Sequence, residues 1–126
     1  MGYVNLSEGE WKIMKVLWKS SSMTGAEIAA ELFEETGWTR ATVFVMLKRL
    51  IAKGAVEIEE RDKHQYYSPI IEKSECRDAE TDSFISRVFD GNVALLVTNL
   101  AGRRKLSEND INELKRLIAE AERETK

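Results

Sequence analysis

The segment TGWTRATVFVMLKRLIAKGAV, which runs from Thr36 to Val56, carries the start and stop signals of one helix. Thr39 is a favourable helix N-cap residue and Gly54 is a natural residue just beyond a helix C-terminus, so we predict a helix over residues 39–53. This segment has four basic residues and no acidic ones, in a chain of 126 residues with a net charge of −3. An acidic protein with one basic helix is compatible with a local surface for an anionic partner.

The predicted helix has two different faces when its residues are placed at about 100° intervals. The apolar side chains expected to face the core are Val43, Met46, Leu47 and Leu50. The other side and its borders hold Thr39, Arg40, Ala41, Thr42, Phe44, Val45, Lys48 and Arg49. Small residues, a hydroxyl, cations and an apolar group that can touch a thymine methyl suit a helix in the DNA major groove. An ordinary solvent-exposed helix with cations near its C-terminus would have a similar sequence. The segments before and after the helix must therefore distinguish the two interpretations.

Three further helices are predicted by the Ser/Thr-x-x-acid spacing of a capping box. The pairs are Ser7–Glu10, Thr24–Glu27 and Ser107–Asp110. They predict helices over about residues 7–19, 24–35 and 107–124. The second of these helices is expected to bury Ile28, Leu32 and Phe33.

A β-hairpin is predicted after Gly54. The residues AVEIEE alternate apolar with polar, RDKH reads as a turn, and QYYS is a second β-prone run that Pro69 ends. Three helices and a hairpin in this order are the layout of a winged helix-turn-helix. We therefore predict a mainly α fold with a small β-hairpin, a DNA-binding domain over residues 1–69 and a wing at 55–68. Arg61, Lys63 and His64 are candidate backbone contacts, although a plain polar turn would have the same composition.

Residues 70–126 are predicted to form a helical dimerisation domain. Helices are expected over about 74–89, 93–102 and 107–124, and three such short helices cannot easily enclose a core of their own. A second copy of the same surface is the usual remedy, so we predict a homodimer. The predicted interface consists of Phe84, Val88, Leu95, Leu96, Ile111, Leu114 and Leu117.

Composition argues against several other classes of protein. The chain is 43% hydrophobic and 33% charged, as in globular proteins. No apolar run is long enough to span a membrane and the N-terminus lacks signal-peptide features, so we expect a cytoplasmic protein without membrane insertion. With one cysteine and one histidine we expect no intrachain disulfide and no metal site built on these residue types. We also expect no cofactor. No phosphate-binding Gly-rich loop or recognisable catalytic constellation is present, so we do not expect an enzyme.

The sequence resembles the penicillinase-repressor family of bacterial transcription factors, the BlaI/MecI/CopY group, over nearly its whole length. The similarity is carried by LSEGEWKIMKVLW from Leu6, WTRATVFVMLKRLIAKGAV from Trp38, YYSP from Tyr66 and LSENDINEL from Leu106. This resemblance implies a homodimer that binds an inverted-repeat operator in double-stranded DNA and blocks transcription. The Cys-x-Cys motifs of the copper-responsive branch are absent.

The resemblance also implies a mechanism of release. In members that control β-lactam resistance, a membrane sensor-protease leads to cleavage of the repressor at an Asn–Phe bond in the C-terminal domain. Asn99–Leu100 stands at the matching position here, with leucine in place of phenylalanine.

One departure from the family pattern leaves an alternative open. Phe44 and Val45 replace residues that are commonly polar in β-lactam-type readers, and the chain is acidic overall. The alternative is a winged-helix protein-interaction module without DNA binding. Salt dependence separates the two, because DNA binding weakens steeply as salt rises.

Overall fold

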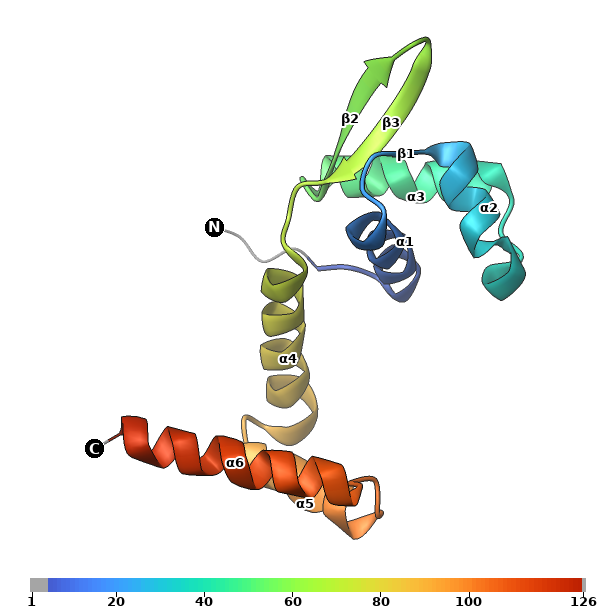
Figure 1. Ribbon diagram of the computed structural model, residues 1–126. Helices are drawn as coiled ribbons and strands as arrows, with labels where there is room; N and C mark the ends of the chain where they lie inside the picture. The colour runs from blue at the N-terminus through green and yellow to red at the C-terminus, as the bar shows by residue number, and fades with distance from the viewer. Residues whose placement is uncertain (1–4, 126) are drawn as a thin grey trace. The chain divides into compact units, whose positions relative to one another are not determined.

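A computed structural model of the chain describes residues 5–125, and over this range it contains six helices and three strands. In chain order they are α1 (Glu8–Lys19), β1 (Met23–Thr24), α2 (Gly25–Thr36), α3 (Arg40–Ala52), β2 (Val56–Arg61), β3 (His64–Pro69), α4 (Lys73–Phe89), α5 (Val93–Gly102) and α6 (Glu108–Glu124) (Figure 1). Two compact units divide between Thr81 and Asp82, within α4. The first unit extends past residue 69, the predicted end of the DNA-binding domain, because Ile71 and Cys76 pack on its core.

The capping residues form as the sequence predicts. Capping boxes start α1 at Ser7, α2 at Thr24 and α6 at Ser107, and in each the side chain of the acid returns to the cap backbone. The Thr39 hydroxyl accepts a hydrogen bond from the Thr42 N–H at 3.2 Å, which starts α3 one residue later, at Arg40. Gly54 has φ +78°, a left-handed conformation that glycine adopts without a Cβ penalty. The chain therefore leaves α3 sharply and enters β2.

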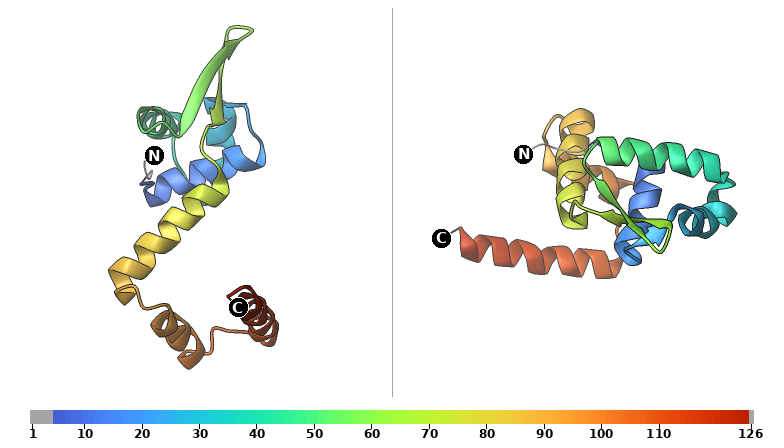
Figure 2. Two further views of the ribbon diagram at one scale, coloured as in Figure 1. Left: turned by 90° about the vertical axis from the view of Figure 1, so that its left-hand side faces the viewer. Right: turned by 90° about the horizontal axis from the view of Figure 1, so that it is seen from above.

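The sheet has three strands in the order β1-β3-β2, where a two-stranded hairpin was predicted. The prediction missed β1 because two residues, Met23 and Thr24, are too few to show an alternating pattern; they pair with Tyr67 and Tyr66. The β2–β3 hairpin closes through Asp62 and Lys63, whose φ values of +50° and +66° match a type I′ turn. The hairpin projects beyond the helices of its unit (Figures 1 and 2).

The core of the first unit lies between α1, α2, α3 and the base of the sheet. Its fully buried large side chains include Ile13, Met14, Leu17, Ile28, Val43, Leu47, Leu50 and Val56. Burial of each such side chain stabilises the fold by about 1.5–3 kcal/mol. The Trp18 Nε1–H also donates to the Ile71 carbonyl at 3.0 Å. The prediction for Phe33 was wrong: it is 59% exposed, because Ala29 and Leu32 occupy the core-facing side of α2.

The second unit contains the end of α4 with α5 and α6, and none of its described residues, 82–125, is buried in the single chain. Neither α5 nor α6 has a buried residue among those described. Phe84 and Phe89 meet edge to face, with ring centroids 5.7 Å apart. In residues 5–125 no helix is long and apolar enough to span a lipid bilayer.

Candidate nucleic-acid interface

The exposed face of α3 carries the residues that the sequence predicts to meet DNA. Val43, Leu47 and Leu50 are buried, and Met46 is half-buried beside them. Ala41, Val45, Lys48, Arg49 and Ala52 are exposed. The small residues among them let the helix backbone come close to a flat partner such as the floor of the major groove.

The cations of this face are available to a ligand. Arg40, Lys48 and Arg49 are all exposed, and none of them forms an ion pair with any residue in the range 5–125. No acidic residue lies in the first turn of α3 to offset them. Unpaired guanidinium and ammonium groups on one helix face are suited to phosphates and guanine edges.

Thr39 and Thr42 lie together at the start of α3. Their hydroxyl oxygens are 3.2 Å apart, and Thr39 also accepts from the Thr42 N–H. The Thr39 side chain is therefore already used as the helix cap. Both hydroxyls can still share a hydrogen bond with a phosphate oxygen placed at the helix N-terminus.

Phe44 packs against protein on the border of the exposed face. Its ring lies edge to face with Tyr67 of β3, with centroids 6.5 Å apart. It also occupies the space above Gly25, where a Cβ would stand only 2.4 Å from Phe44 Cε1. Phe44 is 39% exposed, so part of the ring still reaches the surface. The apolar side chain at this position is thus explained by the notch that Gly25 leaves in α2.

We predict that Gly25→Ala destabilises the protein by about 1–3 kcal/mol, the usual cost of overpacking. The new methyl group would displace the Phe44 ring and weaken its contact with Tyr67. Urea unfolding measures the change. Gly102→Ala is the matched control, because a Cβ there meets nothing within 4 Å. A smaller side chain in the double variant Gly25→Ala/Phe44→Leu should restore stability, whereas equal stability of Gly25→Ala and wild type would contradict the packing argument.

The three predicted contacts of the wing differ in their surroundings. The Arg61 guanidinium lies 4.2 Å from the centre of the Tyr66 ring, donates to Ser22 and approaches Glu59 Oε1 at 3.6 Å. Arg61 therefore stabilises the hairpin through contacts within the protein. Lys63 and His64 are exposed at the turn and have no ion-pair partner among the described residues. They remain the better candidates for contact with a phosphate backbone.

The strand β2 adds negative charge to the wing. Glu57, Glu59 and Glu60 are all exposed. Carboxylates repel phosphates, so contact of the wing with DNA is best confined to its turn. A hollow of about 630 Å³ is lined by this wing and the start of α2, and its lining includes Phe44, Glu60, Lys63, His64 and Tyr66.

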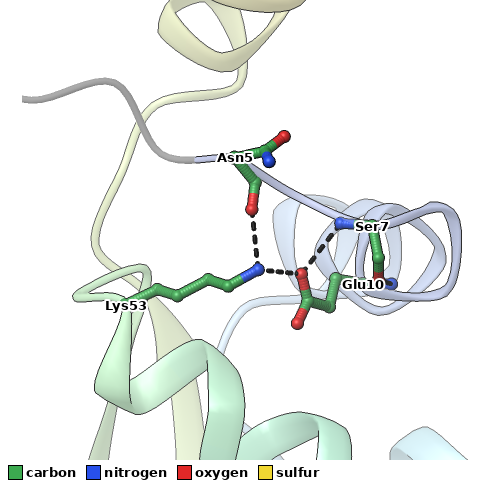
Figure 3. A network of polar contacts seen from close by, with 4 residues as sticks. All are labelled: Asn5, Ser7, Glu10 and Lys53. Carbon is green, nitrogen blue, oxygen red and sulfur yellow. Dashed lines mark hydrogen bonds and ion pairs between the residues drawn. The ribbon is translucent and has the colours of Figure 1, made fainter.

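The C-terminal end of α3 is tied to α1 by charged groups that the site prediction did not include. Lys53 Nζ donates to Glu10 Oε1 at 2.5 Å and to the Asn5 carbonyl at 2.6 Å (Figure 3). Glu10 Oε1 also accepts from the Ser7 N–H at 2.9 Å, and the Glu10 side chain is only 2% exposed. Glu10 was recognised only as a capping acid, since nothing in the sequence joins it to a lysine 43 positions away.

This network makes stability depend on pH. Burial raises the pKa of Glu10, but hydrogen bonds from Lys53 and Ser7 and the charge of Lys53 outweigh it, so the pKa lies below its ordinary value of 4.5. A carboxyl whose pKa is lower in the folded state contributes stability above its unfolded pKa and loses it as pH falls through the folded value. Denaturant unfolding from pH 7 to pH 3 should therefore show a shallower loss of stability for Glu10→Gln than for wild type. Parallel pH profiles of the two proteins would contradict this assignment.

The fold and this surface define a winged helix-turn-helix domain in which α3 carries an exposed basic face. Residues 6–120 match the sequence profile described as Penicillinase repressor, and the chain belongs to that family. No group of three or more metal-ligating side chains is placed to hold an ion within the described range, 5–125.

Relatives and solved structures agree with this family assignment. The chain is 34% identical to the penicillinase repressor of Bacillus licheniformis, over 91% of this chain and 90% of the relative. It is 28% identical to the methicillin resistance regulatory protein MecI of Staphylococcus aureus, over 90% and 92% of the two chains. The DNA-binding domain of the repressor BlaI matches at TM-score 0.53 and 35% identity, covering 59% of this chain and 90% of that one. The Bacillus licheniformis BlaI monomer in complex with the blaP half-operator matches at TM-score 0.52, with the same identity and coverage.

Proposed function

We propose that the chain is a homodimeric transcriptional repressor, which places α3 in the major groove of an inverted-repeat operator and the turn of its wing on the adjacent backbone. The observation that carries this proposal is the exposed face of α3, where Lys48 and Arg49 lie beside Ala41 and Val45 and have no ion-pair partner among residues 5–125. The BlaI relative, which is 35% identical over the matched part, is bound to a half-operator in its structure.

The dimer is supported by the apolar surface of the second unit. Phe84, Val88, Leu95, Ile111 and Leu117, all predicted at the interface, are 40–52% exposed in the single chain. Leu96 and Leu114 are half-buried. Val93, Val97 and Ile118 of the same unit are also exposed, at 57%, 40% and 58%, and were not predicted at the interface. Large apolar side chains exposed together indicate a surface that another molecule covers. A second copy of the chain has the same exposed apolar surface, so two copies can bury these surfaces against each other.

The alternative of a protein-interaction module loses part of its support. It rested on the acidic balance of the chain and on apolar side chains at positions 44 and 45, and Phe44 is accounted for by its contacts with Gly25 and Tyr67. Val45, which is 50% exposed, still fits either a thymine methyl or a protein partner.

The test is enrichment of genomic DNA. Purified full-length protein is mixed at physiological salt with sheared DNA from its own genome, and the retained fragments are sequenced. The expected result is a sharp peak that contains an inverted repeat. A folded, dimeric protein that enriches no sequence would overturn the repressor proposal and favour the interaction module.

We further propose that repression is relieved by cleavage between Asn99 and Leu100, through a membrane sensor-protease. Both residues lie in the last turns of α5, and the Asn99 Oδ1 accepts from Arg103 Nε at 3.3 Å. Helical backbone groups are already hydrogen-bonded, whereas proteases commonly hold the chain extended. Cleavage therefore requires the end of α5 to unwind. Asn99 is exposed and Leu100 half-buried, so little packing opposes this unwinding in the single chain.

Exposure of cells to the inducing antibiotic tests this step. The expected product is a C-terminal fragment whose first residue is Leu100, identified by mass spectrometry. An Asn99→Ala variant should stay intact, whereas Asn92→Ala, altered at the N-cap of the same helix, should still be cut. Release of the operator while the chain remains uncut would overturn the proposal.

A further inference from the structure

The C-terminal end of α3 is held by a charged contact within the protein, between Lys53 and Glu10. Lys53 is the C-cap residue of α3, and its ammonium group reaches back to Glu10 and Asn5 at the N-terminal end of α1. Figure 3 shows the lysine extended across the gap between these two elements, with both acceptors on the α1 side. Two of the three N–H bonds of its ammonium group are thereby used inside the protein.

We propose that Glu10 and Lys53 are positioning residues for operator recognition, which fix the angle of α3 in the groove. This inference rests on the proposed DNA binding. The opposite part of α3 is held by apolar packing, where Phe44 fills the notch above Gly25 and contacts Tyr67. Val43, Leu47 and Leu50 also bury the core face of α3 along its length. The contact with Glu10 adds a hydrogen-bonded attachment at the C-terminal end of the helix, and a hydrogen bond is directional where apolar packing is not.

The burial and charge of the Glu10–Lys53 pair support a role in fixing the orientation of α3. Glu10 is 2% exposed, whereas the Lys53 side chain is 36% exposed. A buried carboxylate without its partner is strongly unfavourable, and a buried ion pair often stabilises no more than an apolar pair of the same volume. Such a pair fixes geometry because the short, hydrogen-bonded arrangement tolerates little displacement. Lys53 is thus not one of the cations that α3 offers to DNA, although the sequence places it in the basic helix.

Glu10→Gln gives a test in which the loss of charge and the loss of positioning change different quantities. Removal of one negative charge should strengthen binding to any DNA, through the general electrostatic attraction of phosphates. Loss of positioning should lower the ratio of operator affinity to random-DNA affinity by about a hundredfold for the dimer, which is roughly tenfold for one misplaced base contact in each half-site. Glu8→Gln is the matched control, since Glu8 is an exposed acid in the same first turn. The ratio for Glu8→Gln should equal that of wild type.

The double variant Glu10→Gln/Lys53→Met tests whether the lysine itself touches phosphate. It removes both charges, so it leaves no unpaired buried carboxylate and should fold. We expect its affinity to keep the wild-type slope against salt, with the reduced specificity ratio of Glu10→Gln. A slope smaller by about two units, one for each half-site, would make Lys53 a phosphate contact and overturn the positioning role.

Amide hydrogen exchange tests the attachment without DNA. The Lys53 and Ala55 N–H groups donate to Arg49 and Leu50 at the end of α3. In Glu10→Gln these amides should exchange at least tenfold faster relative to the core amide of Leu47, and in Glu8→Gln they should not. Equal exchange and equal specificity in the two variants would refute the inference. Failure of wild type to prefer any operator would refute the proposed function, and the exchange data would still decide whether Glu10 holds α3.

Discussion

Replacement of Ile118 with lysine should convert the protein from a dimer to a monomer at micromolar concentration. Ile118 is 58% exposed in the single chain and lies on the apolar stripe of α6 with Ile111 and Leu114. In the proposed dimer each interface gains two buried ammonium groups, and each costs several kcal/mol unless it finds a partner. We expect the dissociation constant of the dimer to rise by about a thousandfold or more. Sedimentation equilibrium measures the change.

The neighbouring variant Ala119→Lys provides the control. Ala119 is also exposed, but it lies about 100° away around α6, on the polar side. The variant Ala119→Lys introduces the same lysine side chain and the same charge outside the apolar stripe, so it should remain dimeric. Both variants should keep the helical content of wild type. A monomeric Ala119→Lys, or a dimeric Ile118→Lys, would place the interface elsewhere. Operator affinity should fall with the dimer, because a monomer binds one half-site only.

The start of a helix is readable from sequence because its chemistry is local. A capping box needs a hydroxyl and an acid three residues apart, so Ser7–Glu10 and Thr24–Glu27 could be recognised without the fold. The turn at Gly54 could be recognised for the same reason, because glycine is favoured where φ is positive. The winged helix-turn-helix follows from the order of these local signals, and the structure confirms it.

The roles of single side chains depend on residues far away in sequence. Phe44 lies near the reading face on a helical projection, and only the fold shows that Gly25 makes room for it. The sequence places Arg61 in the charged turn of the hairpin, whereas in the structure its guanidinium stacks on the Tyr66 ring and donates to Ser22. Lys53 belongs to the basic helix by sequence and to a pair with Glu10 in the structure. Contact of the remaining residues with DNA stays a prediction, and Arg49 offers its sharpest test.

Arg49→Ala should weaken operator binding by about 2–6 kcal/mol per dimer if the guanidinium reads a guanine. One such contact contributes about 1–3 kcal/mol, and a dimer on an inverted repeat loses it in both half-sites. The side chain is exposed on α3 without an ion-pair partner in the described part of the chain, so its removal should leave the fold intact. Titration of operator and random DNA at several salt concentrations measures the effect.

The pattern of loss tells what Arg49 contacts. A base contact predicts that operator binding falls far more than random-DNA binding, whereas a phosphate contact predicts equal losses and a smaller salt slope. Arg49→Lys separates charge from shape, because lysine keeps the charge but cannot form the two parallel hydrogen bonds of a guanidinium. If Arg49 reads a guanine, lysine should restore random-DNA binding and only part of operator binding. Wild-type affinity of Arg49→Ala at moderate salt would remove Arg49 from the interface and shift the reading role toward Lys48 and Val45.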